Sequence, residues 1–542
     1  MKKIEKIIKV FLLAVFTFSL TNCEDQLTTN SSTAVSANEI LSSTTGLNML
    51  LRSAYNYVLF GDRSEGDQGH AAYIGIPGFH LYYDISGDDI LVTGAMGGTP
   101  EYCYMFDSRR TLANQSYAAK IWRNYYVIIN QANLIIDALA DASGTDAEKK
   151  ELEGQAKAMR GISYFHLLIN YQQTYAIAKN KRGVILRTHA DDPTEKGFST
   201  VQECYDQVVA DLKDAKSLLA GFNRGEKWQI NDDVAAGYLA RVYQVMNNWE
   251  GALSEANYVY QRHSTLMTKE EWCGGFDEVD MEEVIWAVYN TNLSNSARNT
   301  PFSYWFNFDP SYGEDQDAMF YHFRELFVNG SYVDLFDDTD YRGTKCTKTE
   351  NVTDEDEKPV MFWHRTNGRT DWATKWAYNK FKYYGTANAE NLPNYSLLRV
   401  SEMLLIKAEA EANLGNPAAL ASLNTLQSAR NAKLTTVTGK EALLEEIYIE
   451  RRKELLGEGC TGMYDYVRLQ RDLVRYEETA EHPDWHFPRG MTNLDGYNGS
   501  DARPSGRMPS NDYRWFCQIP TDEFSNNTAI NSETDQNPFR GQ

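Results

Sequence analysis

The segment INDDVAAGYLARVYQVMNNWEGALSEA, residues 230–256, contains the pattern that decides the fold. Asn231 can cap a helix in which small and apolar side chains recur at three- and four-residue spacing. Asn247-Asn248 interrupts this pattern, and a partner helix is expected from Trp249 onward. The side chains expected to point inward are those of Ala236, Leu239, Ala240, Tyr243, Met246, Ala252 and Ala256. The segment therefore predicts a helical hairpin.

Three further stretches show the same helical periodicity. They are residues 116–140, residues 149–171 and residues 398–431, the last of which turns at Gly415-Asn416-Pro417 and predicts a second hairpin. Paired helices with small residues at their contacts look like tetratricopeptide units, which hide their apolar faces only by stacking. We predict a mostly all-α fold of tetratricopeptide-like helical hairpins that form a right-handed superhelical scaffold.

Three regions between these helices lack clear periodicity. Residues 61–115, 264–395 and 476–514 combine Gly and aromatic side chains with scattered polar residues. Long loops inside a compact protein usually carry function. We therefore expect residues 39–542 to form one helical domain whose loop-rich insertions make a large binding face.

The first 38 residues have the composition of an export signal followed by a tether. Four lysines precede the apolar, uncharged run of residues 10–20, which is shorter than the roughly 20 residues needed to span a bilayer. Leu20-Thr21-Asn22-Cys23 resembles a lipobox, although Asn22 replaces the usual small residue. We predict a signal peptide over residues 1–22, lipidation of Cys23, and a polar tether over residues 23–38, so that the lipid alone attaches the chain to a membrane. The alternative is an ordinary signal with an incidental cysteine.

The formal net charge is −22 at pH 7. This balance opposes nucleic acid binding, which requires clustered Lys and Arg against phosphates. It also opposes adsorption to anionic lipid, and it fits a solvated extracellular surface.

The chain has no motif that predicts catalysis or zinc binding. HExxH, GxSxG and GxxxxGK[ST] are absent, and the six cysteines after Cys23 lack metal-ligand spacing. We expect mostly free buried thiols, with room for one disulfide. Acidic clusters at Asp88-Asp89, 277–280 and Glu282-Glu283 could supply an acid/base pair or bind calcium, but solvated surface charge is the simpler interpretation. We therefore predict no enzymatic activity and no cofactor, with structural calcium left as an alternative.

Aromatic residues give the more specific signal, since the chain contains 34 Tyr and 11 Trp. The densest clusters are PFSYWFNFDPSY at 301–312, FHLYY at 79–83 and YCYMF at 102–106. A flat aromatic ring can cover the C–H face of a sugar while nearby polar groups bind its hydroxyls. The predicted ligand-binding residues are Tyr83, Tyr104, Trp272, Tyr304, Trp305, Asn307 and Tyr312. The alternative is that these rings pack small cores inside the loops or contact a partner protein.

Several segments, taken in order, resemble one known family across nearly the full chain. They are NQANLIIDAL (130–139), GQAKAMRGISYFHLL (154–168), residues 230–256, EEVIWAV (282–288), SLLRVSEMLLIKAEAEANLG (396–415), ERRKELLGEG (450–459) and QNPFRGQ (536–542). Together with the lipobox they resemble the SusD/RagB family of surface glycan-binding lipoproteins. The segment GCTGMYDYVR (459–468) departs from the family, which usually has an arginine soon after Gly-Glu-Gly. Arg160 and ERRKELLGEG are expected to be structural, through ion pairs and helix capping.

The resemblance implies a lipid-anchored protein of the outer membrane that faces the cell exterior. It also implies a partner, a SusC-like TonB-dependent transporter, to which the protein would deliver an oligosaccharide or polysaccharide. Capture of a peptide is the first alternative, and a surface glycoside hydrolase is a less favoured one. A third alternative is a structural lid that binds only the transporter.

Overall fold

The computed structural model describes residues 37–61, 75–92, 117–276, 280–289, 326–346, 361–365, 375–378, 380–381, 394–475 and 506–538. The predicted signal peptide, Cys23 and the tether lie outside these residues. Within them, no helix combines the length and apolar character needed to cross a membrane.

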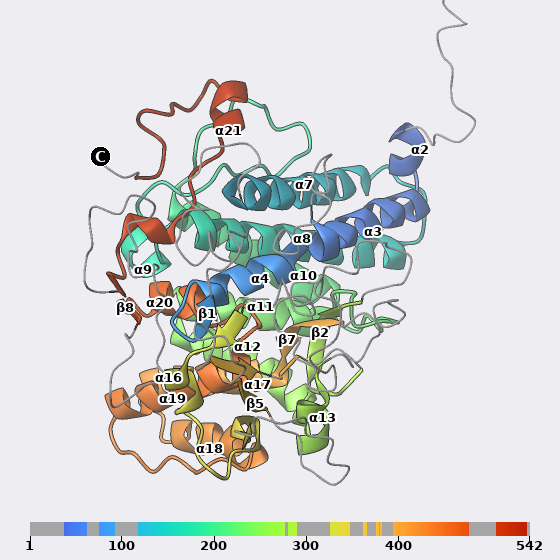
Figure 1. Cartoon of the computed structure of the whole chain (residues 1–542). Helices are drawn as coiled ribbons and strands as arrows, with labels where there is room; N and C mark the ends of the chain where they lie inside the picture. The colour runs from blue at the N-terminus through green and yellow to red at the C-terminus, as the bar shows by residue number, and fades with distance from the viewer. Residues whose placement is uncertain are drawn as a thin grey trace, which may run out of the picture.

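Long helices form the body of the molecule and follow one another through space in chain order (Figure 1). Each packs on its neighbour along the series α7, α8, α10, α11, α12 and α17, and α17 in turn contacts α18 and α19. Their bounds are α3 Thr44–Phe60, α7 Tyr117–Ala138, α8 Asp146–Tyr171, α10 Val201–Leu218, α11 Asp232–Val245, α12 Trp249–Arg262, α17 Val400–Asn413, α18 Ala419–Ala429 and α19 Lys440–Leu455. This mostly helical arrangement confirms the predicted fold class, while the tetratricopeptide-like superhelix and its handedness stay predictions.

Shorter helices lie at the ends of this series and beside it (Figure 1). They are α2 Ala37–Leu41, α4 Gly75–Ile85, α9 Tyr175–Ala178, α13 Lys269–Gly274, α16 Gly330–Val333, α20 Met463–Arg468 and α21 Thr521–Asn526, with 3₁₀ turns η3 Tyr341–Gly343 and η4 Tyr513–Trp515. α4 lies inside region 61–115, for which the sequence predicts a loop. Its eleven residues are all buried, so it has no exposed polar face to create a helical periodicity.

Both predicted hairpins are present, and their turns have the expected chemistry. The Asn231 side chain accepts a hydrogen bond from the Val234 amide at 3.1 Å and caps α11. Asn247 has a positive φ of 56°, and the Asn248 side chain then caps α12. In the second hairpin, Gly415 has a φ of 69°, a conformation that favours glycine.

Small residues occur where helices approach other elements closely. A Cβ on Gly237 of α11 would lie 2.4 Å from Leu398 Cδ2, and one on Gly161 of α8 would lie 3.1 Å from Leu212 Cγ. Gly237 therefore lets α11 approach Leu398 of β7 closely, and Gly161 lets α8 approach Leu212 of α10 closely. An added methyl group would not fit at either contact, because protein interiors have no spare volume.

Three small sheets replace part of the predicted loops, which corrects the sequence interpretation of these regions. β1 (Ile90–Val92), β3 (Leu326–Val328), β6 (Lys375–Tyr378), β5 (Phe362–Arg365) and β4 (Lys345–Cys346) form one sheet in that order. β2 (Val284–Val288) pairs antiparallel with β7 (Tyr395–Arg399), and β8 (Leu473–Arg475) pairs with β9 (Gly506–Met508). Strands of two to five residues are too short to produce a detectable alternation.

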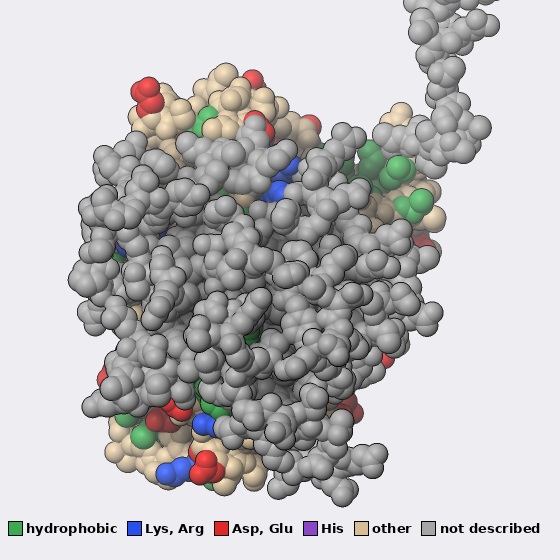
Figure 2. Space-filling view, in the orientation of Figure 1, with side chains coloured by type: hydrophobic (Ala, Val, Ile, Leu, Met, Phe, Trp, Pro, Cys, Tyr) green, Lys and Arg blue, Asp and Glu red, His purple; other side chains and the backbone are tan. Residues whose placement is uncertain are grey.

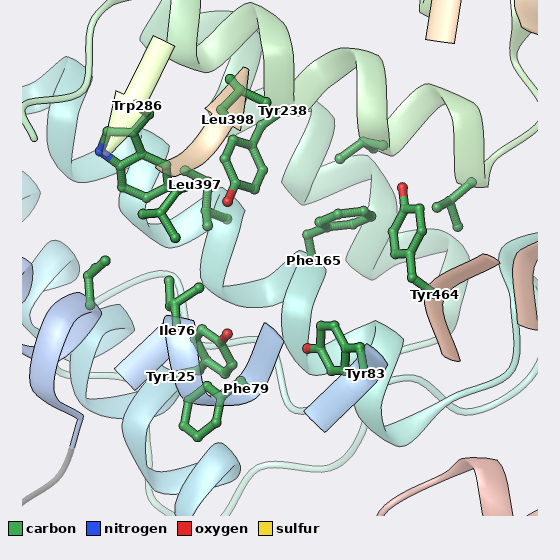
Figure 3. Packing of buried hydrophobic residues seen from close by; sticks show 14 of the residues in the cluster. Ile76, Phe79, Tyr83, Tyr125, Phe165, Tyr238, Trp286, Leu397, Leu398 and Tyr464 are labelled. Carbon is green, nitrogen blue, oxygen red and sulfur yellow. The ribbon is translucent and has the colours of Figure 1, made fainter. Parts of the chain in front are cut away.

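The core is rich in aromatic side chains that come from distant parts of the chain. In Figure 3, Phe165 from α8 and Tyr238 from α11 lie between Tyr83 of α4 and Trp286 of β2. Tyr238 and Trp286 pack edge to face, with ring centres 5.6 Å apart. The β2–β7 ribbon is thus part of the helical core. Cys204, Cys273, Cys460 and Cys517 are buried and form no disulfide, as expected.

The described surface has few large exposed apolar side chains. Met49 of α3 is 58% exposed, and hydrophobic side chains show in Figure 2 where α2 and α3 lie. Ile177, Leu414 and Leu434 are also exposed, but each belongs to a different segment. Single exposed apolar residues of this kind are normal for a folded protein.

Candidate functional site

The predicted ligand-binding residues separate into two groups. Tyr104, Tyr304, Trp305, Asn307 and Tyr312 lie outside the described residues, so their ligand contact stays a prediction. Tyr83 and Trp272 lie within them, on α4 and α13.

Tyr83 is a core residue. Its ring is 0% exposed, and its hydroxyl accepts a 2.6 Å hydrogen bond from Asn170 Nδ2. The ring of His166 lies nearly parallel to it, with 6.4 Å between ring centres. A fully enclosed ring cannot stack on a sugar. Tyr83 therefore packs in the core, which corrects the prediction that it contacts ligand.

Trp272 is enclosed in the same way. Its side chain is 0% exposed, with the ring of Phe276 packed edge to face at 5.3 Å. The Lys380 ammonium lies 5.8 Å from the indole centre, and the indole N–H points toward Glu454 Oε1 at 3.4 Å. Trp272 thus lines a buried charged site, and this burial corrects the prediction that it contacts ligand.

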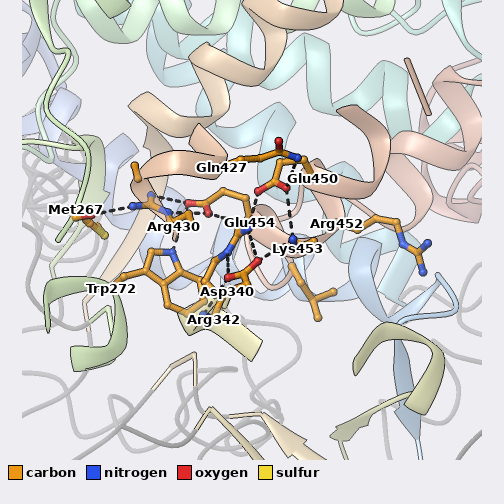
Figure 4. A network of polar contacts seen from close by, with 12 residues as sticks. Met267, Trp272, Asp340, Arg342, Gln427, Arg430, Glu450, Arg452, Lys453 and Glu454 are labelled. Atoms are coloured by element: carbon orange, nitrogen blue, oxygen red, sulfur yellow. Dashed lines mark hydrogen bonds and ion pairs between the residues drawn. The ribbon is translucent and has the colours of Figure 1, made fainter. Parts of the chain in front are cut away.

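That charged site is a network of five cations and five carboxylates, which we call the interior ion network. Its members are Arg342, Lys380, Arg399, Arg430 and Lys453 with Glu283, Asp340, Glu450, Glu454 and Glu458, all at most 4% exposed. Figure 4 shows how Arg342, Arg430 and Lys453 surround the acids of α19. Equal numbers of opposite charges allow such a network to be buried, since an unpaired charge in the interior is very costly.

Glu454 lies at the centre of the interior ion network. Its Oε1 is 2.9 Å from both Arg399 Nη1 and Arg430 Nη2, and its Oε2 is 2.8 Å from Arg342 Nη1. Burial alone would raise the pKa of Glu454, but the three guanidinium groups hold that pKa well below its usual range. Glu454 is therefore ionised and connects three segments far apart in the sequence.

The glycine-rich turn after α19 is held by α4. Asp84 accepts hydrogen bonds from the Gly457 and Gly459 amides at 2.9 and 3.1 Å, and from the Thr461 hydroxyl at 2.6 Å. Gly459 has a φ of 72°, and a Cβ there would lie 2.3 Å from the His80 ring. Burial raises the pKa of Asp84 to about 7 despite these donors. The expected structural role of ERRKELLGEG is thus confirmed.

Arg160 also has the structural role expected of it. Its guanidinium forms a two-point contact with Asp211, at 2.8 Å from Nε and 2.7 Å from Nη2. A further nitrogen donates to Asn133 Oδ1 and to the Thr188 carbonyl. Arg160 therefore joins α7, α8 and α10.

Three acids from the clusters that the sequence singled out, Asp88, Asp89 and Glu283, are buried with polar or basic partners, whereas residues 277–279 lie outside the described residues. Asp89 contacts Arg452, with 3.0 Å between Oδ2 and Nε, and Asp88 accepts a 2.7 Å hydrogen bond from the Tyr466 hydroxyl. Glu283 belongs to the interior ion network. Among the described residues, no group of three or more potential ligands is arranged to hold a metal ion.

The five-stranded sheet brings together the ends of two aromatic-rich segments. β1 and β3 are antiparallel, with Val92 opposite Leu326 and Ile90 opposite Val328. Residues 93–116, which include Tyr104, continue from Val92. Residues 290–325, which include Trp305, end immediately before Leu326. Their attachment points are therefore neighbours on one edge of the sheet.

An open pocket of about 530 Å³ lies elsewhere, beside the loop between α10 and α11. Its lining includes Phe222, Arg224 and Lys227 from that loop and Tyr289 beyond β2. The rest of the lining comes from other residues of the loop, the start of α11, the end of α12 and Asp280 before β2. No pocket is predicted here from the sequence. The segment FNRGEKW (222–228) nevertheless places Arg224 and Lys227 on either side of Gly225, a pattern that could have indicated an anion site.

Comparisons with known proteins give consistent matches. Residues 96–244 match the family described as "Starch-binding associating with outer membrane", and residues 373–539 match the family described as "SusD family". SusD-like proteins P2 and P38 of Formosa agariphila are each 24% identical to the chain. The first match covers 72% of the chain and 79% of that relative, and the second covers 65% and 72%.

Solved structures share the architecture. A SusD-like carbohydrate binding protein from Bacteroides vulgatus is 25% identical, with a TM-score of 0.72, over 91% of this chain and 98% of that one. A SusD superfamily protein from Bacteroides thetaiotaomicron has a TM-score of 0.71 at 24% identity, over 92% of this chain and 100% of that one. The similarity thus extends over nearly the whole molecule.

Proposed function

Because this chain belongs to the SusD/RagB family, we propose that it captures an extracellular glycan at the cell surface and passes it, chemically unchanged, to an outer-membrane transporter. The Bacteroides vulgatus protein that shares its architecture is described as carbohydrate binding. The chain also lacks the sequence motifs of hydrolases.

The pairing of β1 with β3 is the observation that carries this proposal. It brings the attachment points of the segments bearing Tyr104 and Trp305 together on one edge of a sheet. Aromatic rings presented from neighbouring points can stack on successive sugars of one chain. Asp89, immediately before β1, contacts Arg452 of α19, and the Asn329 amide after β3 donates to the Asp89 carbonyl at 2.8 Å, so both strands are fixed to the helical body.

Isothermal titration of the purified protein against a panel of neutral and acidic oligosaccharides tests glycan capture. We expect saturable binding of at least one class. Binding of peptides with no response to any glycan would replace glycan by peptide as the cargo. Chromatography of the same mixtures tests the absence of catalysis, because sustained production of shorter sugars by pure protein would identify a hydrolase.

The transporter and the lipid anchor complete the proposed function. We propose that lipidated Cys23 holds the protein on the outer leaflet, where it meets a SusC-like TonB-dependent transporter. Affinity purification from native membranes should recover a large outer-membrane barrel protein with this chain. Recovery of the chain alone under mild detergent conditions would contradict the partnership.

A further inference from the structure

The pocket beside the α10–α11 loop is held rigidly against β2. Arg224 Nη2 donates to the Ile285 carbonyl at 2.6 Å, and the Ala287 amide donates to the Lys227 carbonyl at 3.2 Å. The Trp286 indole N–H donates to the Trp228 carbonyl at 2.9 Å. The loop therefore has a fixed shape before any ligand arrives, which lowers the entropic cost of binding.

Two cations in this pocket have only carbonyl partners among the described residues. Arg224 donates to the carbonyls of Lys227, Gln229 and Ile285, and the Lys227 ammonium donates to the Met281 carbonyl. No carboxylate lies within 4 Å of either group in the described part of the chain, whereas Arg262 on the opposite wall is paired with Asp233 at 2.7 Å. The positive charge of Arg224 and Lys227 is thus left for another partner.

The acids in the pocket lining form no ion pair with Arg224 or Lys227. Glu226 and Asp280 are exposed, so water and salt screen them, while Arg224 and Lys227 are partly buried. Asp232 already accepts a 2.7 Å hydrogen bond from Tyr258 and lies 3.4 Å from Arg262. Arg224 and Lys227 are therefore the partly buried charges of the lining that have no ionic partner among the described residues.

We propose that this pocket binds an anionic sugar residue, whose carboxylate or sulfate group would contact Arg224 and Lys227. The half-buried rings of Phe222 and Tyr289 in the pocket lining offer apolar surface for the sugar ring. This inference rests on the proposed function, since it specifies a class of glycan. It adds a site away from the sheet edge that carries the aromatic segments.

The titration of Lys227 supports this assignment. Burial and the neighbouring Arg224 lower the pKa of Lys227 to about 8, while Asp280 and Glu282 of the facing segment act in the opposite direction. Tyr289, also on that segment, accepts a hydrogen bond from the Lys227 amide at 3.3 Å. A bound anion would stabilise the protonated ammonium. The affinity for an acidic sugar should therefore fall between pH 7 and pH 9, as free Lys227 loses its proton.

The test compares oligosaccharides that carry uronate or sulfate groups with neutral ones of equal length, using the full chain in detergent. We expect Lys227→Met to weaken binding of the acidic ligand at least tenfold at pH 7 and to leave neutral ligands unaffected. Lys227→Arg should retain binding and lose the decline toward pH 9. Lys181→Met, at an exposed lysine distant in sequence, is the matched control.

Two results would overturn the inference. Equal affinity of wild type and Lys227→Met for acidic sugars, with both variants folded, would exclude Lys227 as a contact. Binding of neutral sugars only would exclude an anionic ligand while leaving the proposed function intact. Failure to bind any glycan would instead contradict the proposed function itself. If Lys227→Met does not fold, the pH dependence of Lys227→Arg decides.

Discussion

Arg399 and Glu454 meet in the protein interior, where Nη1 lies 2.9 Å from Oε1 and neither side chain is exposed. Arg399 ends β7, and Glu454 lies in the last turn of α19. Their contact joins the ribbon at the end of region 264–395 to the C-terminal helices. The frame that supports the proposed binding face is thus held by charge as well as by apolar packing.

Removing one partner from this contact should be strongly destabilising. We expect Arg399→Met to lower the free energy of unfolding by about 3–5 kcal/mol, because Glu283, Glu454 and Glu458 would lose a shared buried counter-charge. Urea unfolding followed by circular dichroism measures the change. Glu445→Gln is the matched control. Glu445 is exposed and its partner Arg471 is only half-buried, so loss of this pair should cost at most about 1 kcal/mol.

The interior ion network should also make stability fall in acid. Burial tends to raise the pKa of Glu458, but Arg399 and Lys380 hold that pKa below its ordinary value of 4.5. A lowered folded-state pKa gives stability that is present above pH 4.5 and lost as the pH falls below it. Glu458→Gln should therefore be less stable than wild type at pH 7, and the difference should narrow below pH 4.5. A difference that stays constant with pH would show that Glu458 is not ionised in the fold.

The close contact at Gly237 predicts a steric effect. Gly237→Ala would place a methyl group 2.4 Å from Leu398 Cδ2, and Leu398 belongs to the buried β2–β7 ribbon. We expect a loss of about 1–3 kcal/mol in thermal or urea unfolding. Gly197→Ala introduces the same methyl group where no atom lies within 4 Å. Equal stability of the two variants would mean that α11 and β7 can separate without cost.

The aromatic segments predict a loss of affinity without loss of fold. Trp305→Ala should weaken glycan binding by about two- to tenfold, since one aromatic stacking contact contributes roughly 0.5–1.5 kcal/mol. Isothermal titration measures the effect, and an unchanged unfolding midpoint shows that the core is intact. Tyr83→Phe serves as a control, because Tyr83 is buried and should not alter affinity. Unchanged affinity after combined substitution of Tyr304, Trp305 and Tyr312 would remove this segment from the binding face.

Lipidation of Cys23 predicts that the protein partitions into detergent and that loss of Cys23 abolishes this partitioning. Cys23→Ala removes the proposed acylation site, so the protein should move from the detergent phase to the aqueous phase in Triton X-114 extraction. The unfolding midpoint of the described domain should not change. A variant that stays with the membrane would indicate attachment by other means.

The helical hairpins could be predicted because their signals are local. Asn231 and Asn248 cap helices within three residues of their own positions, and Gly415 directly follows the C-cap residue of α17. The sheets could not be predicted, because β1 pairs with a strand more than two hundred residues away and each contributes only three residues. Local periodicity has no access to such pairings.

The candidate site was harder to predict, because residue type does not reveal burial. Tyr83 and Trp272 lie in aromatic-rich segments like the other candidates, yet both are enclosed by the core. Conversely, Arg342 and Arg399 are of a residue type that usually lies at the surface, yet both are fully buried. Structural ion pairs are predicted from the sequence only for Arg160 and ERRKELLGEG.

The position of Glu454 has a consequence for how such a molecule can diversify. One short stretch of α19 supplies the counter-charges for Arg342, Arg399 and Arg430, so the docking of three segments is specified by a few neighbouring residues. The segments that leave this frame can then change in length and composition without a redesign of the interior. A single scaffold with a fixed set of anchors could thereby accept exchanged recognition loops, which makes it a suitable host for grafting new specificities.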